Sequence, residues 1–272
     1  MDITKKTLGT LFIIAMLFAS PAFAATDTSS NWGGYVVQNG AYTGVSGTFV
    51  MPELSYSSSL ASNATWVGIG GRTTSDLIQA GVYEIADANG ATYQAWYEML
   101  PDDSVPVDLP VHPRDSVSVA ILETSTDVWN IVITNNTTKQ QFAKTVQYHS
   151  LHSSAEWIQE RPQVNGTLPP LSGFTPVKFT NAYAVENGQR LTLNQMNPIS
   201  ISLLDTQPNI ALAVPSIVGS DNTSFTVFRT SAVASAATPI DSHVPQYLLR
   251  RTGHDILPSI PGWNWTILFQ PR

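Results

Sequence analysis

From Asn31 onward the sequence alternates between apolar and polar residues in short runs, and this period of two constrains the fold most strongly. Clusters of Gly, Pro, Asn and Asp separate the runs, as expected for strands joined by turns. No stretch shows the 3.6-residue period of an amphipathic helix of ordinary length. Strands are expected at 35–37, 44–51, 65–69, 77–83, 92–99, 116–122, 128–134, 156–160, 177–184, 199–204 and 224–229. The chain is therefore predicted to be all-β, as a β-sandwich or jelly roll.

Residues 1–24 resemble a secretory signal peptide. Lys5 and Lys6 are followed by an apolar run at 8–18 and by the small-residue site Ala22-Phe23-Ala24. The run is too short to span a membrane, which takes about 20 apolar residues. We therefore expect a secreted protein that has lost this segment; an uncleaved anchor is the alternative.

The rest of the sequence divides into a main domain at 25–231 and a C-terminal extension at 232–272. Residues 232–239 are small and linker-like, and the tail that follows is rich in proline. A segment of about 40 residues does not fold easily alone, so we expect the extension to pack on the main domain.

Composition narrows the class of protein. The chain has no cysteine, so neither disulfides nor thiolate chemistry are expected. An exported protein without cysteine is more typical of bacteria. Charged residues make up 12% and the net charge is −7, so the basic surface that nucleic acid requires is missing. The sequence contains no nucleotide-binding loop and no HExxH zinc motif. We expect a monomer with no metal, no cofactor, no nucleic-acid partner and no membrane contact after signal cleavage.

The run at 77–83 carries an isolated amide side chain. Alternation places Ile78, Ala80 and Val82 toward the core of a half-buried strand. Gln79 and Gly81 then share the opposite face. A glycine inside a strand often marks the close approach of another backbone or a ligand.

Aromatic and acidic side chains are expected on the same face of the neighbouring strands. Trp66 and Trp96 alternate with core residues in their own runs, and Glu98 follows Trp96 on the same face. Glu156 and Glu160 share one face of a third run. Aromatic and polar groups beside bare glycine backbone are typical of a cleft for an extended polymer. Carboxylates in such surroundings are partly desolvated, which raises their pKa and suits acid–base chemistry.

These residues also have structural interpretations, and other catalytic motifs must be compared with them. Most tryptophans on strands belong to a core, and most glutamates on strands are solvated. The five histidines form no metal-like pair, and no Gly-x-Ser-x-Gly elbow is present. Asp27-Thr28-Ser29 resembles the aspartic-protease triplet, but it lies close to the expected mature terminus, in a segment predicted to be mobile.

Seven blocks follow one another in the order of a known family. They are SNWGGY at 30–35, VSGTFVMP at 45–52, WVGIGG at 66–71, LIQAG at 77–81, AWYE at 95–98, SAEWIQE at 154–160 and FTNA at 179–182. This succession resembles the glutamic peptidases (the eqolisin family, peptidase family G1) and covers about residues 29–230. The chain is similar to a bacterial-type member, without the propeptide and cysteines of the fungal enzymes.

The resemblance implies a concanavalin-like sandwich of two bent antiparallel sheets whose concave face binds polypeptide. It also implies an endopeptidase that is active in acid, insensitive to pepstatin and dependent on a Gln/Glu dyad. The Gln corresponds to Gln79, and we assign the catalytic Glu to Glu156, with Glu160 in reserve because both share one strand face. The expected cleft residues are Trp66, Gly81, Trp96, Glu98 and Glu160.

Two positions depart from the fungal pattern. Gly70 stands where that pattern has Asp, and Tyr83 stands near a second Asp position. The carboxylate network around the dyad is therefore expected to be thinner here, which leaves the pH optimum open.

The side chains suffice for amide hydrolysis without a metal or nucleophile. A carboxylate can be the base and then the acid, so Glu156 is predicted to activate water and to protonate the leaving amine. The amide of Gln79 can stabilise the oxyanion and orient the water.

Two rival functions stay open on the sequence. A β-sandwich glycoside hydrolase would use Glu98 and Glu156 as its carboxylate pair, about 5–5.5 Å apart in a retaining enzyme. A non-catalytic carbohydrate- or peptide-binding module could have the same fold.

Overall fold

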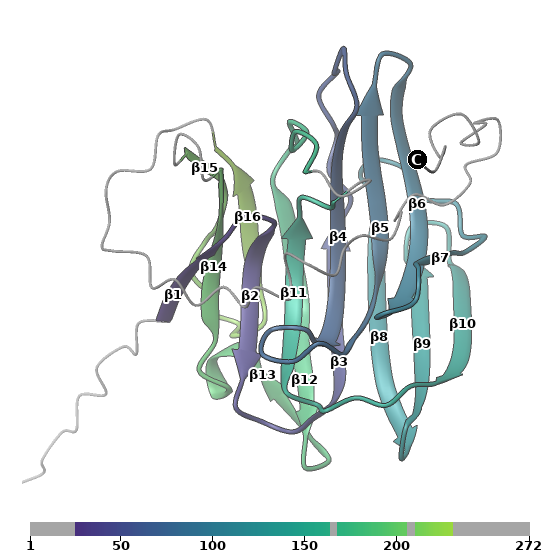
Figure 1. The fold of residues 1–272 in the computed structure, drawn as a ribbon, viewed down its shortest axis with the longest axis vertical. Helices are drawn as coiled ribbons and strands as arrows, with labels where there is room; N and C mark the ends of the chain where they lie inside the picture. The colour runs from purple at the N-terminus through teal and green to yellow at the C-terminus, as the bar shows by residue number, and fades with distance from the viewer. Residues whose placement is uncertain (1–24, 164–167, 206–209, 231–272) are drawn as a thin grey trace, which may run out of the picture.

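The computed structural model describes residues 25–163, 168–205 and 210–230, which form an all-β fold (Figure 1). Within these ranges the helical structure is one 3-10 turn, η1 (Leu193–Gln195). No helix of the described chain is long and apolar enough to cross a membrane. The predicted signal peptide at 1–24 and the predicted extension at 232–272 both lie outside the described residues, so both stay predictions.

Sixteen strands build the described fold, as one continuous hydrogen-bonded sheet that folds back on itself. They are β1 (Ala25–Ser29), β2 (Trp32–Gln38), β3 (Tyr42–Val50), β4 (Ala61–Gly70), β5 (Leu77–Asp87), β6 (Gly90–Met99), β7 (Val105–Pro106), β8 (Ser116–Ser125), β9 (Val128–Asn135), β10 (Gln140–Gln147), β11 (Ser154–Glu160), β12 (Val177–Glu186), β13 (Gln189–Thr192), β14 (Ile199–Asp205), β15 (Ile210–Pro215) and β16 (Phe225–Arg229). The order is β10-β9-β8-β3-β12-β16-β15-β14-β2-β11-β4-β5-β6-β7, with β1 beside β14 and β13 beside β12. The pairs are antiparallel except β1 with β14, which is parallel.

The main hydrophobic core lies between the two halves of this sheet. Val67 on β4 and Val82 on β5 belong to the same buried cluster as Val119 on β8, Ile131 on β9 and Phe179 on β12. Strand β3 contacts β4, and β8 contacts both β4 and β5, so the halves are packed face to face. This arrangement is the predicted β-sandwich.

Each of the eleven predicted strands overlaps an observed one, and the missed strands have physical reasons. The residues of β10 are mostly exposed on both faces, so the strand shows no apolar alternation. Strands β7 and β13 have two and four residues, too few for a period to be visible. Strand β1, at Ala25–Ser29, is polar and pairs with β14, which corrects the expectation that the Asp27-Thr28-Ser29 segment is mobile.

The site strands are direct neighbours, in the order β2-β11-β4-β5-β6. Because side chains alternate between faces, the register decides which side chains can meet. Val67, Ala80 and Trp157 point into the main core. The residues before and after each of them in the same strand therefore point away from the core. These outward residues form the candidate site.

Candidate active site

Three rows of side chains cross the face opposite the main core. The first row is Glu156, Gly68, Gln79 and Glu98, on β11, β4, β5 and β6. The second is Ile158, Trp66, Gly81 and Trp96, in the same strand order. The third is Trp32 on β2, then Glu160, Ala64, Tyr83 and Gln94. The structure thus brings all seven predicted site residues to one face of four adjacent strands.

This face is not the half-exposed surface that alternation predicts. Trp32, Trp66, Leu77, Tyr83 and Trp96 form a second buried cluster on it, separate from the main core. Every residue of β5 up to Ala86 is buried. The prediction of a half-buried strand is therefore wrong, because the large aromatic side chains of neighbouring strands cover one another.

Gln79 is 5% exposed and is held by its cross-strand partner. Its Nε2 donates a hydrogen bond to Oε2 of Glu98. Its Oε1 is buried and accepts no hydrogen bond from the described residues. An amide nitrogen has two hydrogens. One hydrogen and the carbonyl oxygen of Gln79 are therefore left for a ligand or water.

Glu98 and Glu160 are two further buried carboxyl groups of this face. Burial raises the pKa of Glu98 to about 8, and the charge of Glu160 adds to that rise. Burial likewise raises the pKa of Glu160 to about 7, against hydrogen bonds that stabilise its charge. Trp66 Nε1 donates to Glu160 Oε2 at 2.7 Å, and Asn31 Nδ2 donates to Oε1 at 3.4 Å. Glu160 is 8% exposed and therefore keeps some access from outside.

Glu156 has different surroundings, although register puts it in the row of Gln79. It is fully buried, and neither carboxyl oxygen has a donor in full hydrogen-bonding geometry among the described residues. Burial holds the pKa of Glu156 well above its usual range, against the Ser154 hydroxyl and the charge of Arg72, which lower it; the charge of Asp76 raises it further. Its charged neighbours therefore come from the loop between β4 and β5, and the Glu98–Glu160 pair is not among them.

Tyr83 lies where the fungal pattern has an acidic residue. Its ring stacks on Trp96, with centroids 4.5 Å apart and planes 13° apart. Burial raises the pKa of Tyr83, as do the charges of Glu98 and Glu160, while Ser104 hydrogen-bonds the hydroxyl. Tyr83 thus packs between the two carboxyl groups as a neutral phenol.

The carboxylate missing at Gly70 is supplied from elsewhere in the sequence. Gly70 has φ +91°, and a Cβ there would lie 2.3 Å from the carbonyl oxygen of Asp76 and 3.0 Å from its Oδ2. Asp76 Oδ2 accepts hydrogen bonds from Ser150 and Leu151, which lower the pKa of Asp76 against the effect of burial. A carboxylate therefore lies beside Gly70, although that residue carries no side chain.

Gly81 is required by the protein's own backbone. A Cβ at this position would lie 2.2 Å from the carbonyl oxygen of Thr65 and 2.6 Å from Cβ of Trp66. The close approach predicted for a substrate is made instead by β4. Gly81 stays in the site because it lies between Trp66 and Trp96.

Asp27, of the possible aspartic-protease triplet, is held by a cation. Arg72 donates to Asp27 Oδ2, and the two side chains form an ion pair between β1 and the loop after β4. Such a pairing suits a structural role for Asp27.

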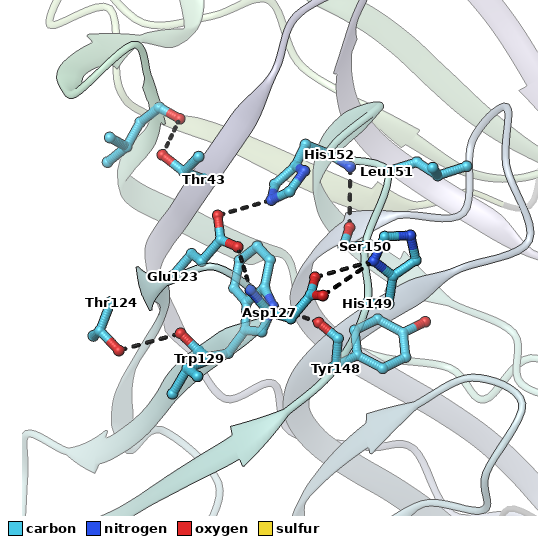
Figure 2. Close-up of polar contacts among 12 residues, drawn as sticks. Thr43, Glu123, Thr124, Asp127, Trp129, Tyr148, His149, Ser150, Leu151 and His152 are labelled. Atoms are coloured by element: carbon cyan, nitrogen blue, oxygen red, sulfur yellow. Dashed lines mark hydrogen bonds and ion pairs between the residues drawn. The ribbon is translucent and has the colours of Figure 1, made fainter.

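A polar cluster fixes the segment that leads into β11 (Figure 2). His152 Nε2 lies 2.8 Å from Glu123 Oε2, and His149 Nδ1 lies 3.1 Å from Asp127 Oδ1. The carboxylates come from the end of β8 and the turn before β9. Both histidines therefore pair with carboxylates that lie outside the three rows of the site. In the described part of the chain, no group of three His, Cys, Asp or Glu residues could hold a metal ion.

The sequence reasoning missed several residues of this site. Asn31 and Trp32 were recognised only as part of a block, although both contact strands of the site: Asn31 bonds Glu160, and the ring of Trp32 meets that of Trp66 edge-on at 5.2 Å. Arg72 and Asp76 lie in a loop, where alternation says nothing about direction. The one signal that the sequence offers is the Gly70-Gly71 pair, since glycines often mark a turn or the close approach of other groups.

Known proteins resemble this chain along most of its length. The peptidase A4 family model matches residues 30–227. Aspergillopepsin-2 of Aspergillus niger is 28% identical over 223 residues, which are 73% of this chain and 77% of that protein. Scytalidopepsin B of Scytalidium lignicola is 32% identical over 178 residues, 61% of this chain and 67% of that one. The crystal structure of scytalido-glutamic peptidase with a transition state analog inhibitor superposes with a TM-score of 0.66 at 26% identity, covering 74% of this chain and 99% of that one.

Proposed function

Because the chain belongs to the peptidase A4 family, we propose that it hydrolyses peptide bonds with Gln79 and a glutamate of β11. The observation that carries the proposal is the row in which Gln79 lies between Glu98 and Glu156, beside a cluster of buried aromatic rings. The seven-block resemblance to glutamic peptidases agrees with the family match.

The register favours Glu156 over Glu160 as the catalytic glutamate. Glu156 lies in the row of Gln79, two strands away with Gly68 between them, so no side chain separates the amide from the carboxyl group. Glu160 lies four residues further along β11 and two rows from Gln79. A general base must lose its proton before it can activate water, and the Ser154 hydroxyl and the charge of Arg72 lower the pKa of Glu156 against the effect of burial. We therefore keep Glu156 as the catalytic glutamate, with Glu160 as the alternative.

Gln79 is suited to the oxyanion. One hydrogen of Nε2 is fixed on Glu98, which sets the plane of the amide and aims the second hydrogen. An oxygen that gains negative charge beside this hydrogen is stabilised in a site with little water. The unpartnered Oε1 of Gln79 is available to accept a hydrogen bond from the attacking water.

The reaction then needs two proton transfers by one carboxyl group. The small fraction of Glu156 that is ionised takes a proton from water as the hydroxyl adds to the carbonyl carbon. The protonated Glu156 next gives that proton to the leaving amine as the C–N bond breaks. Glu98, with its pKa raised to about 8, stays neutral in acid and does not compete for the proton.

The substrate is proposed to be polypeptide, cleaved in acid outside the cell. Trp32, Trp66, Tyr83 and Trp96 pack against one another on the face that carries Gln79 and keep water away from that part of the site. The predicted signal peptide supports an extracellular enzyme.

The glycoside hydrolase is not favoured. Glu98 and Glu156 end a four-residue row with Gln79 between them, three strands apart. At roughly 4.8 Å per strand their backbones are about 14 Å apart, a long span for a retaining pair.

The testing experiment is a casein digest in acid with pepstatin present. We expect cleavage by the wild type and loss of it in Gln79→Ala and Glu156→Gln, both purified as folded protein. Cleavage abolished by pepstatin would instead indicate an aspartic mechanism. Binding of peptide without turnover across the acid range would indicate a binding module.

A further inference from the structure

A second polar cluster lies behind the site, on the core side of the same strands. Asn63, Thr65, Glu84 and Gln159 are each 0% exposed. Thr65 Oγ1 bonds Glu84 Oε1 and lies 2.5 Å from Gln159 Oε1. Gln159 Nε2 and Asn63 Nδ2 each donate to Glu84 Oε2 at 3.3 Å. We name these four residues the inner network.

Three members of the inner network are sequence neighbours of site residues. Thr65 precedes Trp66 on β4, Glu84 follows Tyr83 on β5, and Gln159 precedes Glu160 on β11. Neighbouring strand residues point to opposite faces. The hydrogen bonds of the inner network therefore tie together, from behind, the backbone segments that carry the third row.

Counting hydrogens shows that the inner network suits a protonated Glu84. The Thr65 hydroxyl has one hydrogen and two oxygen neighbours. If that hydrogen goes to Gln159 Oε1, then Glu84 Oε1 must itself donate to Thr65. If the Gln159 amide is turned over, its oxygen faces Glu84 Oε2 at 3.3 Å, and that contact again needs a proton on Glu84. Either orientation is complete when the carboxyl group is neutral.

The charges around the inner network do not compensate an ionised Glu84. The titratable group opposite it on β6 is Tyr93, whose pKa is raised to about 12 by burial and by the charge of Glu84 itself, with a smaller contribution from Glu53. Arg229 on β16 donates a hydrogen bond to the carbonyl oxygen of Ser172, and the backbone N–H of Ser172 donates to Asn63 Oδ1. Ser172 therefore separates the charge of Arg229 from the inner network. Burial raises the pKa of Glu84 to about 7 in spite of its hydrogen bonds.

We propose that Glu84 is a positioning residue that acts in its protonated form, locking β11 to β4 and β5 behind the site and loosening them when it ionises. Its kinetic consequence rests on the proposed peptidase function; its effect on stability does not. The inner network thus makes integrity of the site depend on acid conditions.

The test compares Glu84→Gln with the wild type by urea unfolding from pH 4 to pH 8, and by kcat and KM. Below pH about 4.5 Glu84 is protonated in both the folded and the unfolded state. As pH rises to about 7 the unfolded chain loses the proton first, so the folding equilibrium constant of the wild type falls by up to tenfold per pH unit on account of this residue. Glutamine has no proton to lose and should lack that part of the slope. Its kcat in acid should match the wild type, and activity should extend to higher pH.

Two further variants separate charge from hydrogen bonding. Glu84→Leu removes both, so it should be less stable than the wild type in acid and lower kcat more than it changes KM. Glu53→Gln is the matched control, because Glu53 is 46% exposed and pairs with Arg114 at the surface; its profile should follow the wild type.

Several outcomes would overturn the proposal. Parallel stability curves for the wild type and Glu84→Gln would show that Glu84 does not hold a proton in the folded state. A Glu84→Gln protein that fails to fold in acid would contradict it equally, because glutamine reproduces the shape and donor of the neutral acid. Equal acid stability and kcat in Glu84→Leu and Glu84→Gln would refute the positioning role. Unfolding is measured without substrate, so the stability comparison still tests the protonation of Glu84 if the proposed peptidase function is wrong.

Discussion

Gln79 and Glu98 lie directly opposite each other on β5 and β6, and the amide donates to the carboxyl group with both side chains buried. A buried amide fixed in this way has one defined direction for its second hydrogen. That hydrogen is the proposed oxyanion donor. The pair is therefore the geometric starting point of the mechanism.

Removing the amide should lower activity without unfolding the protein. Gln79→Ala is expected to reduce kcat by on the order of 10²–10³, the usual effect of losing one oxyanion donor. Gln141→Ala, on the exposed strand β10, is the control and should match the wild type. Single-turnover peptide cleavage measures both; near-normal kcat in Gln79→Ala would rule out the oxyanion role.

The two glutamates of β11 should respond differently to the same substitution. Glu156→Gln should abolish cleavage, because the base is lost from the row of Gln79 while the side chain keeps its size. Glu160→Gln should keep measurable kcat, since the amide oxygen can still accept a hydrogen bond from Trp66 or Asn31. The reverse result would make Glu160 the catalytic residue.

Loss of the indole donor should change the pH dependence of stability. In Trp66→Phe the hydrogen bond to Glu160 Oε2 disappears, and this bond lowers the pKa of Glu160. The pKa of folded Glu160 should therefore rise further, so the stability lost with rising pH on account of this residue should extend to higher pH by about one unit, from the strength of a hydrogen bond to a charged group. Urea unfolding between pH 5 and 9 measures this, with Trp129→Phe, which loses a bond to the carbonyl of Tyr148, as the control. An unchanged pH dependence would show that the indole does not stabilise the charge of Glu160.

Glu98 should make the protein more stable in acid than above neutral pH. Its pKa is raised from 4.5 in the unfolded state to about 8 in the folded state, mainly by burial. The contribution is complete below pH about 4.5 and is lost as pH rises toward 8, at up to about 1.4 kcal/mol per pH unit. Urea unfolding at pH 4, 6 and 8 should show a flatter dependence in Glu98→Gln; an unchanged slope would show that Glu98 titrates normally.

A methyl group at position 81 should destabilise the fold. Gly81→Ala places Cβ against the carbonyl oxygen of Thr65, a backbone atom that cannot move aside cheaply. We expect a loss of about 3 kcal/mol or more in unfolding free energy. Gly68→Ala, whose nearest contacts are 3.1 Å, should cost less. Equal costs would indicate that β4 and β5 can separate at Gly81.

Period-two alternation predicted which face each site residue occupies, because strand geometry leaves two directions for a side chain. It placed Gln79, Trp66 and Glu160 together without knowledge of the pairing. Alternation also points Glu84 inward, yet a charged residue is not expected in a core. The inner network that accommodates it depends on Thr65 and Gln159, which only the strand order brings close.

The choice between Glu156 and Glu160 could not be made from the pattern for a similar reason. Both point the same way from β11, so what separates them is what surrounds each carboxyl group. Asn31 reaches Glu160 from the turn before β2, and Arg72 and Asp76 reach Glu156 from a loop. Contacts of this kind join segments far apart in the sequence and follow no local period.

Strand β11 carries both glutamates and is paired on each side, with β2 and with β4. Its amide hydrogens should therefore be among the slowest in the molecule to exchange with deuterated water, since local fraying starts from unpaired edges. A heated sample should lose catalytic activity only in step with its tertiary structure. Residual activity can then serve as a simple reporter of the folded fraction.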